Sequence, residues 1–236
     1  MCEVNQKSGP SLPVPPYNPK LRTLIELKRK WHHNPDVHDQ QRGFKGWHER
    51  GYLPHFDAPN ITQFVTFMLD DAFPIKRRRE WEPILQHPVE SLRRRKLEAW
   101  LDRGHGECWL RLPEVASIVE RTLRREDGQA YRLQAWVVMP NHIHLVVDVW
   151  QTPLSQMLKL WKGRSSFDAN RLLRRQGRFW QKEYFDTYVR DAEHLLRAIR
   201  YTEWNPVKAA LVRDPRQWPW SSARFRDEFN RLPSQR

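Results

Sequence analysis

The pattern of apolar and polar positions separates a core-forming middle of the chain from two polar ends. Apolar residues concentrate between about Ile61 and Phe225. Within this part, four short segments are rich in β-branched and aromatic residues, which favours strands. Only a short Met-Pro-Asn link separates the second segment from the third, so these two are expected to form an antiparallel pair. The predicted strands cover residues 61–69, 131–138, 142–149 and 184–190.

Helical periodicity predicts the remaining elements of this middle part. Prolines interrupt the first helical segment, so it is expected to hold two helices, the second beginning near Pro88. Asp191 is placed to cap the last helix, and Pro206 is expected to stop it after about Trp204. The order of elements indicates an α+β fold with helices packed on an antiparallel sheet. The predicted helices lie within residues 76–103, 113–125, 153–174 and 191–204.

The two ends of the chain differ from this middle. Residues 1–20 are rich in proline and poor in apolar residues, which is typical of a disordered tail. Residues 21–60 mix charged, turn-forming and aromatic residues, which indicates an ordered extension or a ligand-binding arm. We therefore expect a disordered or extended tail over 1–45, one domain over 46–225 and a short tail over 226–236.

The charge balance points to a polyanionic partner. The 236 residues include 41 Lys and Arg against 28 Asp and Glu, a net charge of +13. Such a surface attracts nucleic acid, because each neutralised phosphate releases condensed counterions. An anionic membrane surface is the second candidate, and a merely soluble basic protein is the third.

Cysteine usage and the N-terminal residues bear on the compartment. Cys2 and Cys108 are far apart and form no C-x-x-C pair, which argues against a zinc finger and against a disulfide framework. The N-terminal residues lack the apolar segment of a signal peptide. No run approaches the ~18 apolar residues of a membrane span. We expect a cytoplasmic, nucleoid-associated protein.

Two histidines begin the third predicted strand. His142 and His144 share one face because strand side chains alternate, while Ile143 points to the other face. Neighbours at this spacing lie ~7 Å apart along a strand, so both imidazoles can lean towards one cation. In isolation, such a pair is at least as often satisfied by backbone groups or water. Here the segment is otherwise apolar, and burying both histidines without partners would be costly, which favours a bound cation.

A tyrosine and an asparagine share a face of the last predicted helix. Tyr201 and Asn205 are four residues apart, which leaves about 40° between them at 100° per residue. They lie beside the apolar stripe of the helix, where a hydroxyl and an amide oxygen can reach a neighbouring surface. Taken alone, Tyr201 is better explained as a packing residue and Asn205 as a helix C-cap.

Several motifs together resemble one family of enzymes. The run WVVMPNHIHLV at 136–146 contains the histidine–hydrophobe–histidine motif of HUH endonucleases. Five further segments are similar to the branch called REP-associated tyrosine transposases, and the resemblance spans roughly residues 46–225. These segments are GYLPHFD at 51–57, GHGECWL at 104–110, GRFWQKEYFD at 177–186, RYTEWNPVKAALV at 200–212 and WPWSSA at 218–223.

The resemblance implies a fold, a nucleophile and a metal site. The implied fold is a ferredoxin-like antiparallel sheet of the HUH endonuclease type, with the paired histidines on a central strand. Tyr201 is then the nucleophile, and His142, His144 and Asn205 hold a divalent metal. Two nitrogen ligands alone suit zinc or nickel, whereas the family points to Mg²⁺ or Mn²⁺. The chain departs from the branch at Ala210, where glycine is commoner.

The activity that the resemblance implies is the cutting and rejoining of single-stranded DNA through a 5′-phosphotyrosine. The partner is hairpin DNA formed by REP-like palindromes, bound by a monomer or a homodimer. One alternative is a domesticated protein that binds the hairpin but no longer cuts. Another is a replication initiator or relaxase, but such enzymes usually carry helicase parts, and the chain has no G-x-x-x-x-G-K-[ST] motif.

Other residues are candidates for the same site or for DNA binding. Tyr184 and Tyr188 are rival nucleophiles on one face of the fourth strand, although they lack a helix-borne amide partner. Any one basic cluster is most often a solvated helix face, but together the clusters could follow the phosphates of a folded hairpin, and an aromatic residue could stack on an unpaired base. The candidate DNA-binding residues are Arg77, Arg78, Arg79, Arg94, Arg95, Arg174, Arg175 and Trp180.

Overall fold

A four-stranded antiparallel sheet forms the centre of the protein. The structure is a computed structural model and describes residues 35–50, 53–87, 89–228 and 230–233. The strand order is β4-β5-β3-β6, and a separate hairpin, β1-β2, stands beside β6. The strands are β1 (Gly46–Arg50), β2 (Leu53–Asp57), β3 (Ile61–Met68), β4 (Tyr131–Val138), β5 (His142–Val149) and β6 (Phe185–Tyr188).

Helices connect the strands in a ferredoxin-like order. Three helices separate β3 from β4, a tight link joins β4 to β5, and one long helix leads to β6. This connectivity, with the strand order, is the split β-α-β arrangement, so the expected α+β fold is confirmed. The α-helices are α2 (Val37–Gln41), α3 (Arg78–Leu85), α4 (Glu90–Asp102), α5 (Pro113–Arg124), α6 (Leu154–Leu172) and α7 (Ala192–Lys208). Short 3₁₀ helices cover Asp70–Ala72, Ile75–Arg77, Trp109–Arg111, Pro215–Gln217 and Ser222–Phe225.

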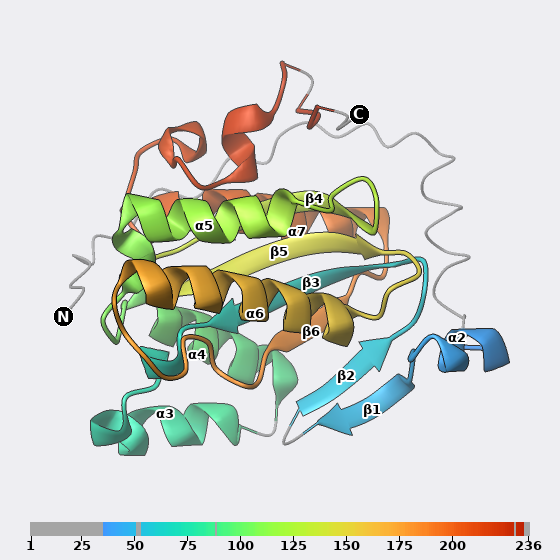
Figure 1. Cartoon of the computed structure of the whole chain (residues 1–236), viewed down its shortest axis with the longest axis horizontal. Coiled ribbons are helices and arrows are strands. Elements are labelled where there is room, and N and C mark those ends of the chain that lie inside the picture. The colour runs from blue at the N-terminus through green and yellow to red at the C-terminus, as the bar shows by residue number, and fades with distance from the viewer. Residues whose placement is uncertain (1–34, 51–52, 88, 229, 234–236) are drawn as a thin grey trace.

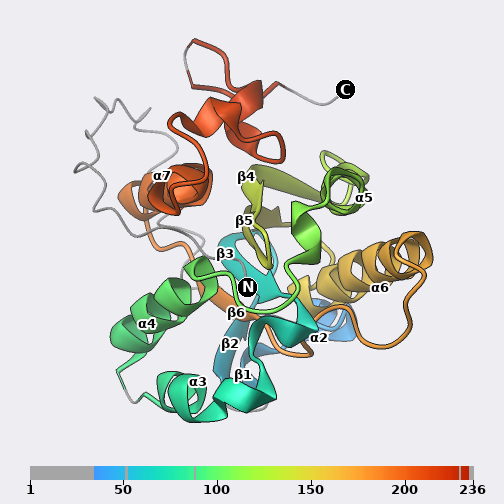
Figure 2. The ribbon, with the colours of Figure 1, turned by 90° about the vertical axis from the view of Figure 1, so that its left-hand side faces the viewer.

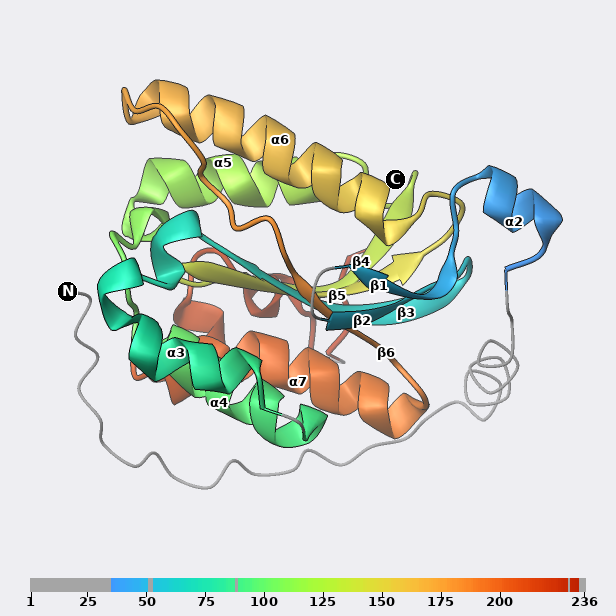
Figure 3. The same cartoon turned by 90° about the horizontal axis from the view of Figure 1, so that it is seen from below.

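The helices form two layers with the sheet between them. Figure 1 looks onto α5 and α6 in front of the sheet. Figures 2 and 3 show α5 and α6 on one side of the sheet and α4 and α7 on the other, with α3 beside α4. Within the described part of the chain, no helix has the length and apolar character needed to cross a membrane.

The central strand β3 separates two different interiors. All of its residues are buried, because both sheet faces are covered. Val65 and Phe67 belong to the main hydrophobic core under α5 and α6, whereas Phe64 packs with residues of α7 on the other face. The register pairs Thr66 with His144. The histidines of β5 therefore lie on the face that α4 and α7 cover.

The last helix continues beyond its predicted end. The expectation that Pro206 stops it after Trp204 is wrong, because α7 runs through Pro206 to Lys208. Proline removes one helical hydrogen bond, but its fixed φ is compatible with a helix. Pro206 is buried, and a bond from the Ala209 backbone N–H to the Asn205 carbonyl (2.9 Å) continues the helix beyond it. Asn205 is therefore a residue of the helix body and not its C-cap.

Segments near both predicted domain limits pack onto the domain. Residues 1–34 lie outside the described part of the chain, whereas the short helix α2 and the buried Phe44 precede β1. Near the other limit, Arg226 forms a buried ion pair with Glu203 of α7 (2.6 Å). The limits at 46 and 225 stay predictions.

Candidate active site

The two histidines of β5 meet at their outer ring nitrogens. The Nε2 atoms of His142 and His144 are 3.1 Å apart, and both side chains are buried. The rings stand nearly perpendicular, with centroids 4.7 Å apart. Alternation along the strand puts the two residues on one face, and their rotamers then converge on one point. The structure thus shows the convergence that the sequence pattern predicts.

The inner ring nitrogens are held by neighbouring polar groups. Asn141 donates its side-chain N–H to the His105 carbonyl (3.0 Å), which turns its amide oxygen towards His142. Nδ1 of His142 therefore donates to Asn141 Oδ1 (2.7 Å), and its Nε2 carries a lone pair. Nδ1 of His144 is 2.8 Å from the hydroxyl of Thr66. Partners of this kind orient metal-binding histidines.

Both histidines are neutral at pH 7. Burial, with a smaller effect of the Lys208 charge, lowers the pKa of His142 to about 3. Burial, followed by the neighbouring His142 and by Lys208, lowers the pKa of His144 well below its ordinary value. Neutral imidazoles are the form that binds a cation. Among the described residues no three His, Cys, Asp or Glu side chains are grouped to hold a metal ion.

Tyr201 lies against this pair. Its ring meets the ring of His144 edge-on, with centroids 5.3 Å apart, and meets Phe64 at 5.7 Å. Burial raises the pKa of the Tyr201 hydroxyl well above its ordinary value, and the nearby Glu98 and Asp102 carboxylates add to this. The phenol is therefore protonated in this state of the protein.

Asn205 lies one helical turn after Tyr201. Its side chain is 1% exposed, and neither atom of its amide group has a hydrogen-bond partner among the described residues. An unsatisfied buried amide costs about 1–3 kcal/mol, so its retention calls for an explanation. An amide oxygen without a partner is available as a ligand for a divalent cation, and the helix that carries it, α7, packs against β5.

Residues of helix α4 border the site next to α7. Arg94 lies over the Phe64 ring at 4.4 Å and bonds to Glu98 (3.2 Å). Asp102 forms an ion pair with Lys208 of α7 (2.9 Å). A cavity of about 10 Å³ lies where the end of α4, His142 and the segment after α7 meet.

The rival tyrosines lie elsewhere. Tyr184 is buried and stacks on His55, with centroids 4.6 Å apart. Tyr188 packs on Phe56 at 5.2 Å and is paired across the sheet with Gln63, which is on the face of β3 opposite Thr66. The structure therefore brings only Tyr201, among these three, into contact with the histidine pair.

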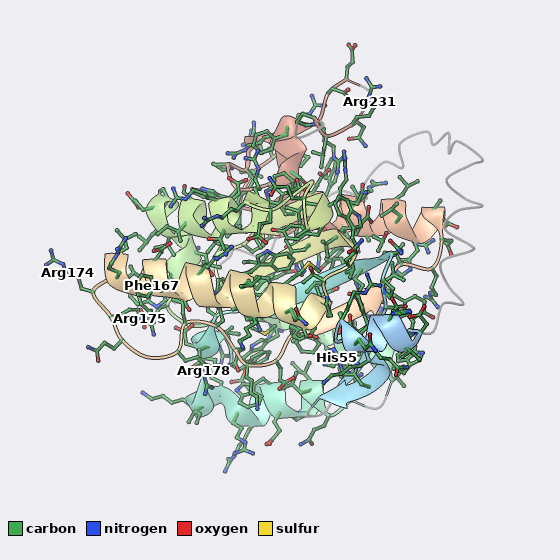
Figure 4. The ribbon with its side chains drawn as sticks, turned by 45° about the vertical axis from the view of Figure 1, so that its right-hand side comes forward. His55, Phe167, Arg174, Arg175, Arg178 and Arg231 are labelled. Carbon is green, nitrogen blue, oxygen red and sulfur yellow. The ribbon has the colours of Figure 1, made fainter. Side chains whose placement is uncertain are left out.

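Of the predicted DNA-binding arginines, Arg94 is the one in contact with this site. Arg77 lies over Trp100 and bonds to Glu80, and Arg78 bonds to Glu82. Figure 4 shows Arg174 and Arg175 at the far end of α6. They are therefore in the helix layer on the other side of the sheet. Arg79 and Arg95 are exposed on α3 and α4, and nothing in the structure links them to the histidines.

Trp180 has a core position. It is 4% exposed, donates its indole N–H to Ser165 (2.9 Å) and meets Phe67 edge-on at 4.9 Å. This packing leaves no face of the indole for a base, so the stacking role expected of Trp180 is wrong for this structure. An aromatic residue beside basic residues gives the same sequence pattern in a core and on a binding surface.

Sequence reasoning missed several residues around the histidines. Asn141 is adjacent to the pair in the sequence and could have been found as a partner of His142. Thr66, Glu98 and Lys208 come from other elements, and only the strand register and the packing of α4 against α7 bring them to the site.

Comparison with known proteins points to one family. The family described as "Transposase IS200 like" matches residues 113–204, which include both histidines and Tyr201. A putative REP-associated tyrosine transposase of Haemophilus influenzae is 27% identical over 96 residues, 36% of this chain and 54% of that protein. The REP-associated tyrosine transposase of Escherichia coli is 25% identical over 108 residues, 42% of this chain and 59% of that protein. The match thus spans little more than half the length of either relative.

Two solved structures are also similar. One is a REP-associated tyrosine transposase bound to a REP hairpin, with 18% identity, a TM-score of 0.45 and coverage of 74% of this chain and 81% of that chain. The other is a putative transposase from Deinococcus radiodurans, with 16% identity, a TM-score of 0.32 and coverage of 65% and 92%. With the family match and the two curated relatives, the resemblance expected from the motifs is confirmed: residues 113–204 match the IS200-like transposase family, and the chain is similar to the REP-associated tyrosine transposases.

Proposed function

We propose that this protein is a metal-dependent endonuclease and strand transferase that acts on single-stranded DNA at REP-like hairpins through Tyr201. The observation that carries the proposal is the meeting of three groups. The Nε2 atoms of His142 and His144 lie 3.1 Å apart, and the Tyr201 ring touches the ring of His144. A nucleophile beside a cation-binding pair is the arrangement that phosphodiester cleavage needs.

The cation would be held by His142, His144 and the amide oxygen of Asn205. Two imidazole nitrogens 3.1 Å apart and an unsatisfied buried amide fit such a group. When bound, a divalent metal polarises a non-bridging phosphate oxygen and orients the phosphate for in-line attack. The family favours Mg²⁺ or Mn²⁺, with water and substrate oxygens completing the coordination.

Tyr201 supplies the chemistry that belongs to the chain itself. Its hydroxyl oxygen forms a bond to the phosphorus, the bond from phosphorus to the 3′-oxygen breaks, and a 5′-phosphotyrosine and a free 3′-hydroxyl result. The phenol proton must leave during attack, because burial and the carboxylates of α4 keep the hydroxyl protonated beforehand. A 3′-hydroxyl from another strand can reverse the step, so joining needs no nucleotide cofactor.

Hairpin DNA is the substrate that the chain's charge and relatives favour. The net charge of +13 suits a polyanion, and one of the solved relatives is described as bound to a REP hairpin. Arg94 lies nearest the Tyr201 centre among the expected DNA-binding residues. Either a monomer or a homodimer is compatible with this proposal.

The test is the covalent adduct. Purified protein with Mn²⁺ or Mg²⁺ should form a protein–DNA adduct with a single-stranded palindromic hairpin, and chelation of the metal should prevent it. Tyr201→Phe should form none, whereas Tyr184→Phe and Tyr188→Phe should form it. An adduct that persists in Tyr201→Phe and disappears in Tyr184→Phe would overturn the choice of nucleophile.

A hairpin-binding protein without cleavage activity is the second candidate. It is favoured if the protein binds palindromic hairpins tightly but nicks none of them with any divalent metal. The contact between Tyr201 and the histidine pair argues for activity, because binding alone requires neither group.

A further inference from the structure

The last turn of α7 brings a cation to the candidate site. Lys208 lies seven residues after Tyr201 and three after Asn205. Seven residues at 100° each amount to two turns less about 20°, so Lys208 projects from nearly the same side of the helix as Tyr201. Asn205 lies on the same stripe. This stripe exists only because α7 continues through Pro206.

The side-chain contacts of Lys208 agree with this placement. Its Nζ lies 5.3 Å from the centre of the Tyr201 ring. Its charge contributes to lowering the pKa of both His142 and His144, so the ammonium is within electrostatic reach of both imidazoles. The ammonium therefore lies beside the Tyr201 ring, on the side of α7 that faces the candidate site.

Lys208 is held in this position by a carboxylate that is more deeply buried than the lysine. Its Nζ is 2.9 Å from Asp102 Oδ2, and the side chain of Lys208 is 45% exposed against 16% for Asp102. A lysine is a compact charge on a flexible stem, so it can change partners by a small movement. Arg94, the other nearby cation, is bonded to both Glu98 and Thr187 and stacked on Phe64.

We propose that Lys208 is a catalytic residue that exchanges Asp102 for a non-bridging oxygen of the phosphate that Tyr201 attacks. This inference rests on the proposed function. A phosphate within reach of the Tyr201 hydroxyl and the histidine nitrogens also comes within reach of the Lys208 ammonium. A fixed positive charge there holds the phosphate for attack and stabilises the charge that develops on its oxygens.

A purely structural role of Lys208 makes a different prediction. In that case the lysine only neutralises the Asp102 carboxylate. Removing both charges together then restores both the stability of the fold and the rate of cleavage. If Lys208 also binds the phosphate, removing Asp102 as well restores the stability of the fold but not the rate of cleavage. The double variant Lys208→Met/Asp102→Asn separates the two roles.

The experiment compares single-turnover cleavage of a palindromic hairpin, the Kd for that hairpin and Tm, all with Mn²⁺. Lys208→Met should lower the cleavage rate roughly tenfold to hundredfold, the effect of losing one group that stabilises transition-state charge, and change Kd less than about threefold. Lys208→Arg should recover part of the rate. Lys208→Met/Asp102→Asn should recover Tm and leave the rate low.

Arg197→Met is the matched control. Arg197 is also on α7 and is paired with an acidic residue, Glu193, but it is exposed. It should cleave at the wild-type rate. A double variant that recovers the rate together with Tm, or a Lys208→Met rate equal to that of Arg197→Met, overturns the inference and leaves the proposed function intact. A wild-type protein that forms no adduct overturns both.

Discussion

Both faces of the central sheet bury histidines, but the groups that pair with these histidines differ between the two faces. On the face covered by α4 and α7, the rings of His142 and His144 point at each other, and their inner ring nitrogens bond to Asn141 and Thr66. On the face covered by α5 and α6, His55 pairs through Nδ1 with Asp186, and both side chains are buried. Figure 4 shows His55 in the β1–β2 hairpin.

This difference distinguishes a structural pair, His55 with Asp186, from a reactive pair, His142 with His144. Nδ1 of His55 and the Asp186 carboxylate are complementary and join the hairpin to β6 directly, while Nε2 of His55 has no hydrogen-bond partner among the described residues. The β5 histidines bring their Nε2 atoms to 3.1 Å from one another, and Asn205 of α7 has an unsatisfied amide. An unsatisfied buried amide costs about 1–3 kcal/mol, a cost that a bound cation would remove. The two faces should therefore respond differently to mutation, metal and pH.

The largest contrast is expected in adduct formation. Replacing both His142 and His144 by alanine should lower the metal-dependent adduct more than ~100-fold, since even loss of a group that only supports a metal ligand costs 10–100-fold. His55→Gln should reduce the adduct only in proportion to the folded fraction, which circular dichroism measures. An equal loss of adduct in a fully folded His55→Gln protein would erase the contrast.

The next largest effect is on the free energy of unfolding, through the pair that His55 of the β1–β2 hairpin forms with Asp186. His55→Ala leaves the Asp186 carboxylate buried without its partner, which should lower the free energy of unfolding by about 3–5 kcal/mol. Adding Asp186→Asn should recover part of this loss. Urea denaturation of the wild type and both variants measures it. If the single variant is as stable as the wild type, the pair does not hold the hairpin.

The pH dependence of stability should also differ between the two faces, because Asp57 of the β1–β2 hairpin titrates with an altered pKa. Burial, with a smaller contribution from Asp186, raises the pKa of Asp57 from 3.8 to about 6. The folded state therefore binds this proton more tightly than the unfolded chain, and the resulting stability is full below pH ~4 and is lost as pH rises through ~6. A shift of this size corresponds to up to ~3 kcal/mol.

Asp57→Asn isolates this effect. Tm measured between pH 4 and 8 should fall less steeply in the variant than in the wild type over the range from ~4 to ~6. The histidine face has the opposite sign, because the lowered pKa of His142 gives stability that is lost as pH falls below ~6.5. Parallel Tm profiles of wild type and Asp57→Asn would contradict the assignment of the pH effect to Asp57.

The smallest expected effect is the most specific for the metal. Asn205→Leu replaces an unsatisfied buried amide by an apolar side chain of similar shape, which should stabilise the metal-free protein by about 1–3 kcal/mol. The same change should remove most of the Tm increase that Mn²⁺ gives the wild type. Thermal melts with and without Mn²⁺ test both parts. A variant that is less stable without metal, or that keeps the full response to Mn²⁺, would exclude Asn205 as a ligand.

Local patterns in the sequence predicted much of the site. The strand over residues 142–149 is observed with those bounds, and its alternation puts His142 and His144 on one face. The helical spacing of Tyr201 and Asn205 also holds, since both lie in α7. These features depend on the geometry of single elements, which neighbouring residues determine.

Only the tertiary structure decided which groups meet. It placed Thr66 opposite His144, kept α7 helical through Pro206 so that Lys208 joined the stripe of Tyr201, and put Trp180 in the core. It also paired His55 with Asp186 on the far face of the sheet. The sequence by itself determined the elements and the faces of their side chains, because periodicity is a local property. The partners across those faces depend on strand register and helix packing, which are set by the burial of the whole chain at once.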